Sequence, residues 1–288
     1  MKINNLKMGI VGHGFVGKAT DWGFSKNIDK FIVDPKYNNS IEDLVSFKPE
    51  IIFVCVPTPM SVNGLQDSSI VIEVISKISA LIPDALIVIK STITPAVIEE
   101  VLKISGNLVY NPEFLREKHA NYDFENSKVI IIGGETEVCK KVALMYKNHS
   151  ICKSNKFHIV DAVTASLVKY SINTFLATKV VYFNELFNLY SKLNVNDSWQ
   201  QVIELISSDE RIGKSHMNVP GHDGKKGFGG ACFPKDSTAL LKYAENLQVD
   251  LDVLKSAIKV NNKIRSAYDS LDEREKQQNI SYNEQEWI

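Results

Sequence analysis

The first half of the chain alternates short, continuously apolar runs with longer segments whose apolar residues recur every three or four positions. The short runs are typical of strands buried on both faces of a sheet, and the longer segments are typical of helices. Strands are predicted at residues 7–12, 31–34, 51–56, 86–89, 108–110 and 129–132. Helices are predicted after the first strand, up to about residue 24, and at residues 69–81, 95–103 and 135–148. This alternation predicts an α/β fold with a doubly wound parallel sheet.

From Asp161 onward the chain follows a helical period only. Residues 161–193 contain no glycine or proline and place apolar side chains three and four positions apart. The spacing predicts one long helix, with Asp161 as its N-cap because a carboxylate accepts the exposed N–H groups of a first helical turn. Further helices are predicted at residues 199–207, 237–246 and 253–267, with a loop rich in glycine and proline between the first two.

The change of period predicts where the chain divides. We expect a Rossmann-like domain over residues 1–160, an all-helical domain with a long central helix over 161–270, and a polar tail over 271–288. A length of 288 residues with 44% hydrophobic content is enough for two cores of this kind.

Composition argues against several classes of partner. The formal net charge is −1 and acids and bases are mixed along the chain, so we expect neither nucleic acid nor an anionic membrane as a partner. No apolar run approaches the length of a membrane span and no secretory signal precedes the first strand, so a cytoplasmic location is expected. The four cysteines form no paired motif, which indicates reduced thiols and no metal site.

The first predicted strand is followed by the pattern Gly12-x-Gly14-x-x-Gly17, and the second strand ends at Asp34. Glycines at these positions permit a tight turn and let a pyrophosphate approach the N-terminus of the next helix. A carboxylate at the end of the second strand accepts hydrogen bonds from an adenosine ribose and repels the 2′-phosphate of NADP. The pattern predicts NAD as the cofactor. The alternative is that the glycines only allow a strand and a helix to pack closely.

Three more loops follow predicted strands and therefore reach the sheet edge at which doubly wound folds bind ligands. They are residues 56–59, 91–95 and 111–117. Thr92 offers a hydroxyl to a cofactor or a water, and capping the helix that begins at Pro95 is an equal alternative. Glu113 and Glu117 bring two carboxylates, one as a base and one as a binding group, although such residues are commonly only solvated.

Lys169 and Asn173 are four residues apart on the predicted long helix and therefore share a face. Their apolar neighbours favour a pair that is at least partly screened from water and suited to stabilise an oxyanion. An ordinary surface lysine is the alternative. Arg211, which precedes the glycine-rich loop, is suited either to hold a phosphate or to form a surface ion pair.

Residues 227–236, with the sequence GFGGACFPKD, are the most informative stretch of the chain. The glycines before Cys232 and the proline at 234 favour a thiol that is accessible and not packed away. Nearby cations favour the nucleophilic thiolate. The alternative is an ordinary cysteine in a glycine-rich loop, and it is the rest of the sequence that argues against this.

Taken together and in this order, these segments resemble the UDP-glucose/GDP-mannose dehydrogenase family of NAD-dependent nucleotide-sugar 6-dehydrogenases. The resemblance spans nearly the whole chain, and its most specific parts are NPEFLRE and GFGGACFPKD. The segments that carry it are GHGFVG (12–17), VPTP (56–59), STITP (91–95), NPEFLRE (111–117), KYSINTFLATKVVYFNE (169–185), RIG (211–213) and GFGGACFPKD (227–236).

The resemblance implies two successive hydride transfers that oxidise C6 of a nucleotide-linked hexose from alcohol to carboxylate, with two NAD consumed. Cys232 would attack the intermediate aldehyde to form a thiohemiacetal, and the second oxidation would leave a thioester. Lys169 and Asn173 would stabilise the oxyanions. Glu113 would act as the base in thioester hydrolysis.

The resemblance also assigns Asp236, together with Lys169 and Thr92, to the proton or water of alcohol oxidation. Arg211 resembles an arginine that reaches the sugar nucleotide of a neighbouring subunit, and a homodimer through the long helix is implied. Cofactor contacts are implied at Gly12, Gly14, Phe15, Val16, Gly17, Asp34, Val56, Pro57, Thr58, Thr92, Glu117 and Lys235. Substrate contacts are implied at Phe114, Leu115, Glu117, Lys169, Asn173, Arg211, Phe228 and Gly229.

One departure from the family concerns length. Members continue into a second Rossmann-like domain that completes the nucleotide-sugar site, whereas this sequence stops at Ile288, so we expect that pocket to be reduced, absent or supplied by another chain.

Two other functions remain as alternatives to nucleotide-sugar oxidation. One is a hydroxyacid dehydrogenase for a smaller substrate, which would not need Cys232, and the other is a non-catalytic NAD-binding or partner module.

Overall fold

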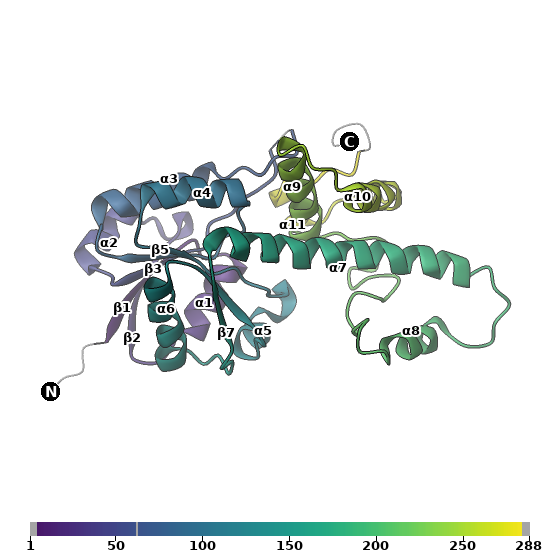
Figure 1. The fold of residues 1–288 in the computed structure, drawn as a ribbon, viewed down its shortest axis with the longest axis horizontal. Helices are drawn as coiled ribbons and strands as arrows, with labels where there is room; N and C mark the ends of the chain where they lie inside the picture. Colours follow the sequence, from purple (N-terminus) through teal and green to yellow (C-terminus); the bar gives the residue numbers. More distant parts are fainter. Residues whose placement is uncertain (1–4, 62, 284–288) are drawn as a thin grey trace. The chain divides into compact units, whose positions relative to one another are not determined.

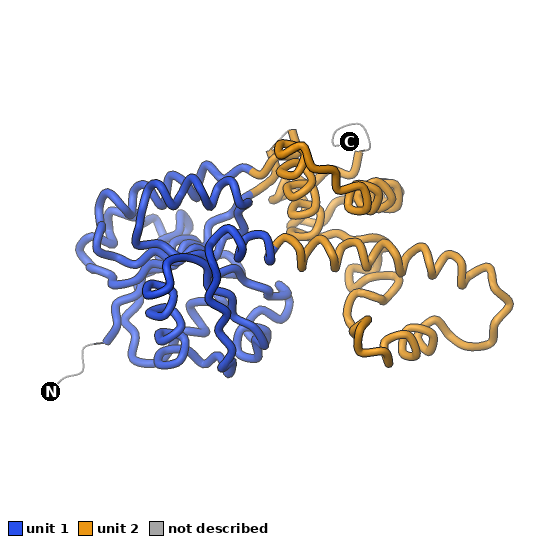
Figure 2. Tube along the Cα trace, in the orientation of Figure 1, with its two compact units in different colours: residues 1–58, 67–169 blue, residues 59–66, 170–288 orange. Residues whose placement is uncertain are grey.

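The computed structural model of the protein describes residues 5–61 and 63–283, which group into two compact units. Unit 1 comprises residues up to 58 together with 67–169, and unit 2 comprises 59–66 together with the chain from 170 onward (Figure 2). The division therefore falls inside a long helix, between Lys169 and Tyr170, whereas the change of sequence period led us to expect it near residue 160.

Within its described residues, unit 1 contains a seven-stranded sheet in the order β2-β1-β3-β4-β5-β6-β7 (Figure 1). The strands are β1 (Leu6–Val11), β2 (Ile28–Val33), β3 (Ile51–Val54), β4 (Leu86–Ile89), β5 (Leu108–Tyr110), β6 (Ile130–Gly134) and β7 (Phe157–Val160). Neighbouring strands are parallel except β5 and β6. The predicted doubly wound α/β class is confirmed, and the strand order reverses between β1 and β3, where such folds bind ligands.

The antiparallel pairing of β6 and the presence of β7 differ from the sequence-based prediction. Residues 111–129, between β5 and β6, carry only a short 3-10 turn at Glu117–His119 and the six-residue helix α5 (Ala120–Glu125). A short connection of this kind suits a strand that starts at the edge where β5 ends and runs antiparallel to it. The side chains of β7 are only partly buried or exposed, so this strand lacks the unbroken apolar run that marks the central strands.

Helices cover both faces of this sheet (Figure 1). On one face, Leu44, Ile75 and Ala165 pack into a single apolar cluster with the strands, and on the other Phe24 and Tyr146 do so. The helices of the first face are α2 (Ile41–Phe47), α3 (Ser69–Leu81), α4 (Pro95–Ile104) and the first turns of α7 (Ala162–Tyr190). Those of the second face are α1 (Phe15–Gly23), α5 and α6 (Thr136–His149), and short 3-10 turns lie at η1 (Pro35–Tyr37) and η2 (Glu117–His119).

The long helix α7 begins as predicted. Asp161 Oδ1 accepts the backbone N–H of Thr164 at 2.8 Å, which is the bond expected of an N-cap carboxylate. Although α7 runs for 29 residues, no helix in the described part of the chain is both long and apolar enough to cross a membrane.

Unit 2 is helical in its described residues. Beyond α7 its helices are α8 (Trp199–Ser207), α9 (Phe233–Asn246), α10 (Asp252–Arg265) and α11 (Glu273–Gln277). Tyr170, Leu241 and Ile258 belong to one apolar cluster that joins α7, α9 and α10. This cluster fixes the orientation of α9, the helix that follows the predicted nucleophile.

The described part of the polar tail expected over residues 271–288 is folded. Asp272 and Glu275 form a capping box at the start of α11, and Glu275 is 0% exposed. Ile280 and Tyr282 are buried against Met60 from the loop 59–66. The sequence pattern misses this packing because the burial of a glutamate depends on partners that are distant along the chain. Residues 284–288 lie outside the described residues.

Candidate active site

The structure accounts in different ways for the three glycines of the dinucleotide motif. Gly12 has φ +88°, and a Cβ there would lie 2.7 Å from the carbonyl oxygen of Cys55. Gly17 is buried against the backbone of Gly12, so only a glycine lets the first turn of α1 approach so closely. Gly14, the N-cap residue of α1, would have nothing within 4 Å of a Cβ. Close packing therefore accounts for two of the glycines, and the third leaves open space at a helix N-terminus.

Asp34 is tied to the glycine loop through the backbone. Its carboxylate accepts the N–H of His13 at 2.6 Å and the N–H of Lys36 at 3.1 Å. Burial alone would raise the pKa of Asp34, but these hydrogen bonds and the Lys36 ammonium at 3.9 Å lower it below its usual value. The carboxylate is therefore ionised at neutral pH, as hydrogen bonding to a ribose requires.

The loops after β3 and β4 lie side by side. Thr58 Oγ1 donates to the carbonyl oxygen of Thr92 at 3.0 Å, and Ser91 Oγ donates to the carbonyl oxygen of Val56 at 2.7 Å. The residue at the N-cap position of α4 is Thr94, two positions after Thr92. Thr92 is half-buried at the carboxyl edge of the sheet.

Glu113 and Lys169 form a buried pair in unit 1. Lys169 is 3% exposed, in agreement with the apolar neighbours that screen it, and Glu113 is 6% exposed. Lys169 Nζ donates to the backbone carbonyl oxygen of Glu113 at 2.6 Å and lies 3.4 Å from Glu113 Oε1. Glu113 Oε2 accepts the N–H of Leu115 at 2.6 Å, and the ring centroid of Phe114 lies 5.0 Å from Lys169 Nζ. A carboxylate and an ammonium group are thus held together at the end of β5.

Sequence reasoning missed a second buried lysine in unit 1. Lys90 directly follows β4, and its Nζ donates to Asn111 Oδ1 at 3.1 Å and to the Tyr146 hydroxyl at 3.3 Å. Together with Glu113 and Cys152, these residues line a small cavity of about 30 Å³. Burial lowers the pKa of Lys90 to about 8. The available signal was a lysine placed directly at the end of an unbroken apolar strand.

Replacing Lys90 by methionine is expected to stabilise the protein at neutral pH. The pKa of Lys90 is about 8 in the folded protein and 10.5 in an exposed lysine, so the folded state disfavours the charged form. The shift corresponds to a destabilisation of roughly 3 kcal/mol below pH 8. This cost disappears between pH 8 and 10.5, because over that range the unfolded chain binds the proton that the folded chain has lost.

Thermal unfolding at pH 7 and at pH 10.5 measures this effect. The gain in Tm for Lys90→Met should be large at pH 7 and small at pH 10.5. Lys103→Met, at an exposed position of α4, is the control and should change Tm little at either pH. A lower Tm for Lys90→Met at pH 7 would contradict the prediction.

Unit 2 holds another buried group of charges at the start of α9. Asp236 is 1% exposed and Lys235 is 5% exposed. Asp236 Oδ2 accepts Asn173 Nδ2 at 2.6 Å, and Asp236 Oδ1 accepts Lys235 Nζ at 2.6 Å. The structure thus brings together two predicted catalytic residues, Asn173 and Asp236. It also pairs Lys235, a predicted cofactor contact, with the same carboxylate.

Cys232 occupies the N-cap position of α9 and is half-buried. The helix begins at Phe233, earlier than predicted, because Pro234 fits the first turn, where its missing N–H costs nothing. A helix N-terminus stabilises a nearby anion. Burial raises the pKa of each of the other three thiols, to about 12 for Cys55 and about 11 for Cys139, and also for Cys152.

Two predicted substrate contacts of unit 2 differ in how far they are exposed. Arg211 has a side chain that is 88% exposed, and its Nη2 lies 2.6 Å from Asp209 Oδ2, which is the surface ion pair given as the alternative. Phe228 is buried with Val181 and Ala257. In unit 1, the exposed or half-buried residues Glu117, Phe114 and Leu115 follow β5.

Side chains from distant segments of unit 2 hold the glycine-rich loop that precedes Cys232. Each of three loop N–H groups donates to a buried side-chain oxygen. The pairs are Gly227 with Asn184 (3.0 Å), Phe228 with Asn261 (2.6 Å) and Gly230 with Glu275 (3.1 Å). Sequence reasoning missed these acceptors, because an asparagine or glutamate in a helical segment carries no signal that it faces a loop.

Two sequence models of one family match the chain. The NAD binding domain of the UDP-glucose/GDP-mannose dehydrogenase family matches residues 36–150, and the central domain of the same family matches residues 163–263. The chain belongs to the UDP-glucose/GDP-mannose dehydrogenase family. The resemblance stated from the sequence motifs is therefore confirmed.

Curated members of the family share more than a third of their residues with the chain over the matched range. The UDP-glucose 6-dehydrogenase of Rickettsia felis is 37% identical over 232 residues, which are 78% of this chain and 49% of the relative. That of Rickettsia prowazekii is 38% identical over 225 residues, 75% of this chain and 50% of the relative. The chain spans about half the length of these relatives.

Solved structures show the same fold. A UDP-glucose dehydrogenase from Pyrobaculum islandicum has a TM-score of 0.78 at 26% identity, covering 91% of this chain and 69% of that one. A 3-hydroxyisobutyrate dehydrogenase from Mycobacterium tuberculosis has a TM-score of 0.68 at 17% identity, covering 93% of this chain and 96% of that one. The second likeness shows a shared fold and nothing further.

Proposed function

We propose that this protein oxidises C6 of a nucleotide-linked hexose of the UDP-glucose type to the uronic acid, with NAD as hydride acceptor and Cys232 as nucleophile. The observation that carries the proposal is the setting of Cys232, which is half-buried at a helix N-terminus four residues before Asp236. Relatives named UDP-glucose 6-dehydrogenase support the substrate class.

The residues of unit 1 fit NAD. Gly14 leaves open space beside the first N–H groups of α1, where a pyrophosphate would accept hydrogen bonds. Asp34 accepts two backbone N–H groups, and a carboxylate has about four acceptor sites, so ribose hydroxyls would find acceptors there. When bound, the nicotinamide accepts the hydrides. An equilibrium titration should show tighter binding of NAD than of NADP, and the reverse order would refute this assignment.

Residues of the chain itself would take up the proton and form the covalent bond to the sugar. Loss of a hydride from C6 and of a proton from its hydroxyl gives an aldehyde, and we assign the proton to Asp236 with Lys169 and Thr92. The Cys232 thiolate would then add to the aldehyde carbon, forming a C–S bond and leaving the negative charge on the former carbonyl oxygen. Lys169 and Asn173 would stabilise this oxyanion.

The second half of the reaction would release the acid. Loss of a second hydride from the thiohemiacetal carbon restores the C=O bond and yields a thioester on Cys232. Glu113, buried beside Lys169, would take a proton from a water that attacks the thioester carbon. The C–S bond breaks, the sugar leaves as a carboxylate, and the thiol is regenerated.

Turnover and trapping test the proposed function together. Purified protein with NAD and a panel of UDP- and GDP-hexoses should form two NADH for each sugar acid. Mass spectrometry of the quenched enzyme should show an acyl group on the peptide that contains Cys232. An absence of turnover with every sugar nucleotide, in protein that binds NAD, would favour a non-catalytic module. Turnover of a small hydroxyacid would favour the other rival function.

We also infer a homodimer through α7. Four large apolar side chains on the unit 2 part of this helix are exposed at spacings of three and seven residues, so they form one stripe. They are Ile172, Phe175, Tyr182 and Leu189, with Phe175 67% exposed and Tyr182 60% exposed. An exposed apolar stripe of this kind is typical of a protein contact surface.

Placing charge on the stripe is expected to dissociate the dimer. The double variant Phe175→Glu with Tyr182→Glu should weaken self-association at least about a hundredfold, because each copy would bury unpaired carboxylates at the contact. Sedimentation equilibrium of the two proteins measures the change. Tyr122→Glu, at a residue of α5 that is 64% exposed, is the matched control and should leave the parent's mass unchanged. A monomeric parent at micromolar concentration would contradict the inference.

A further inference from the structure

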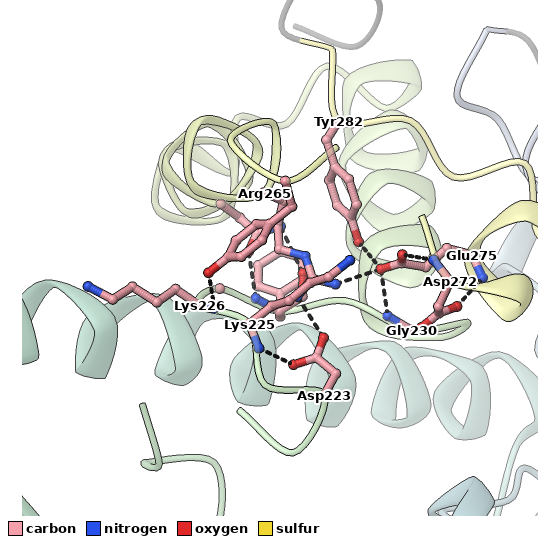
Figure 3. A network of polar contacts seen from close by, with 12 residues as sticks. Asp223, Lys225, Lys226, Gly230, Arg265, Asp272, Glu275 and Tyr282 are labelled. Carbon is pink, nitrogen blue, oxygen red and sulfur yellow. Dashed lines mark hydrogen bonds and ion pairs between the residues drawn. The ribbon is translucent and has the colours of Figure 1, made fainter. Parts of the chain in front are cut away.

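One buried carboxylate fastens the glycine-rich loop to the C-terminal segment of unit 2. Figure 3 shows Glu275 at the centre of this network, and the residue is 0% exposed. Its Oε1 accepts hydrogen bonds from Gly230 N–H at 3.1 Å, Arg265 Nη2 at 2.8 Å and the Tyr282 hydroxyl at 2.7 Å. Its Oε2 accepts the N–H of Asp272 at 2.9 Å. Among these donors, Gly230 belongs to the loop, so Glu275 joins the loop to α10, α11 and Tyr282.

Arg265 completes this clamp from α10. Its side chain is 1% exposed and pairs with Asp223, which precedes the loop, and with Glu275 (Figure 3). Nη1 lies 2.7 Å from Asp223 Oδ2, and Nη2 lies 2.8 Å from Glu275 Oε1. The backbone of Gly229 passes directly against these groups, since a Cβ there would collide with both Arg265 and Glu275.

The carboxylate of the clamp is held in its charged form. Burial alone would raise the pKa of Glu275, but the hydrogen bonds from Tyr282, Asp272, Gly230 and Arg265 lower it below the usual value. At neutral pH the loop is therefore fastened by a charge-assisted hydrogen bond, which is stronger than one to a neutral acceptor.

The glycines of the loop would have wide backbone freedom without contacts from side chains elsewhere in unit 2. Gly224, Gly227 and Gly230 adopt φ values of 76°, 75° and 77°, in the left-handed region. Glycines lose more conformational entropy on ordering than other residues, so an ordered loop of this kind needs fixed contacts. Gly230 lies two residues before Cys232, and its bond to Glu275 therefore sets the direction from which the chain enters α9.

We propose that Glu275 and Arg265 are positioning residues for Cys232, acting through Gly230 to hold the thiol at the N-terminus of α9. The inference rests on the proposed function in so far as Cys232 is the nucleophile. Both residues lie beyond residues 163–263, the range matched by the family's central domain. The two clamping side chains therefore belong to a part of this chain that neither family model matches, while Gly230 and Cys232 lie within the central-domain match.

The rate at which iodoacetamide alkylates Cys232, measured against pH in the full-length protein, tests the proposal. Mass spectrometry of the peptide that contains Cys232 separates its rate from that of the half-buried Cys152, which serves as an internal control in unit 1. Glu275→Ala should lower the rate at Cys232 about tenfold at pH 7 and raise the pH of half-maximal alkylation by about one unit, because the thiolate loses its fixed place at the helix end. The rate at Cys152 should not change.

Two further variants separate positioning from general stability. Glu275→Gln keeps an oxygen acceptor for Gly230 but loses the charge, so its effect should be smaller than that of alanine and in the same direction. If the alanine variant does not fold, the alkylation profile of Glu275→Gln tests the proposal in its place. Tyr282→Phe removes a hydrogen bond to the same carboxylate without touching Gly230, so it should leave the alkylation profile of Cys232 unchanged.

The outcomes are distinct. A fall in Tm for the Glu275 variants with no change in the pH profile of Cys232 would overturn the proposal and leave a structural role only. An altered profile in variants of a parent that oxidises no sugar nucleotide would uphold the positioning role and refute the proposed function instead. In an active parent, Glu275→Gln should lower kcat and leave the Kd of NAD unchanged.

Discussion

Replacing Cys232 by alanine is expected to lower sugar-acid formation at least about a thousandfold, because removal of a covalent nucleophile leaves only binding and electrostatic catalysis. The affinity for NAD should stay the same, since Cys232 is not among the predicted dinucleotide contacts, all of which except Lys235 lie in unit 1. No other thiol is suited to replace it. Cys55 and Cys139 are buried, and burial raises the pKa of each well above neutral.

Rates of NADH formation and of acid formation, measured with the sugar nucleotide that the parent accepts, determine this effect. Cys152→Ala is the matched control, because Cys152 is also a half-buried thiol and has no assigned role in the chemistry. A Cys232→Ala variant with more than a tenth of the parent's activity would exclude the thioester route. It would favour a dehydrogenase that oxidises an alcohol without covalent catalysis.

Replacing Asp236 by alanine is expected to cost about 3–5 kcal/mol of stability, because removing one partner of a buried ion pair strands the other charge. Lys235 is 5% exposed and its Nζ lies 2.6 Å from Asp236 Oδ1, so the ammonium would lose its counter-charge in a dry environment. The amide of Asn173 would lose its acceptor as well. Urea unfolding, compared at equal slope, gives the free energy of unfolding.

A double variant tests the cause of this loss. Lys235→Met with Asp236→Leu removes both charges and keeps apolar volume, and such replacements are often neutral or stabilising. It should recover most of the stability that Asp236→Ala loses. If the double variant is as unstable as Asp236→Ala, the loss reflects the shape of the side chain and not a stranded charge.

The sequence predicts the elements of the sheet well because burial on both faces leaves a strong signature. The bounds of α3, α8, β4 and β5 agree with the sequence pattern, since these segments are either unbroken apolar runs or have clear helical periods. Strand β7 has no such run, because its side chains are partly buried or exposed. Periodicity therefore fails where an element has no fully buried face.

The motifs identify candidate site residues, but they do not identify the partner of each one. Lys169 and Glu113 are 56 positions apart, and the sequence does not indicate that the lysine donates to the backbone carbonyl of that glutamate. The two predicted residues Asn173 and Asp236 meet across 63 positions. Glu275 looks like a solvated charge in a polar segment, and its burial depends on Arg265 and Gly230. Polar pairing between distant positions is decided by tertiary packing, which periodicity does not report.

The loop 59–66 comes from the first third of the sequence, yet its contacts belong to unit 2. Met60 donates its N–H to the carbonyl oxygen of Gln278 at 3.1 Å, and Asn279 Nδ2 donates to the carbonyl oxygen of Met60 at 3.0 Å. The polypeptide consequently passes between the units at three points along its length, after residues 58, 66 and 169. Cutting the chain at one position therefore does not separate the two units. A fragment ending at residue 160 would carry Met60 without the Gln278 carbonyl oxygen and the Asn279 side-chain amide that bind its N–H and its carbonyl oxygen.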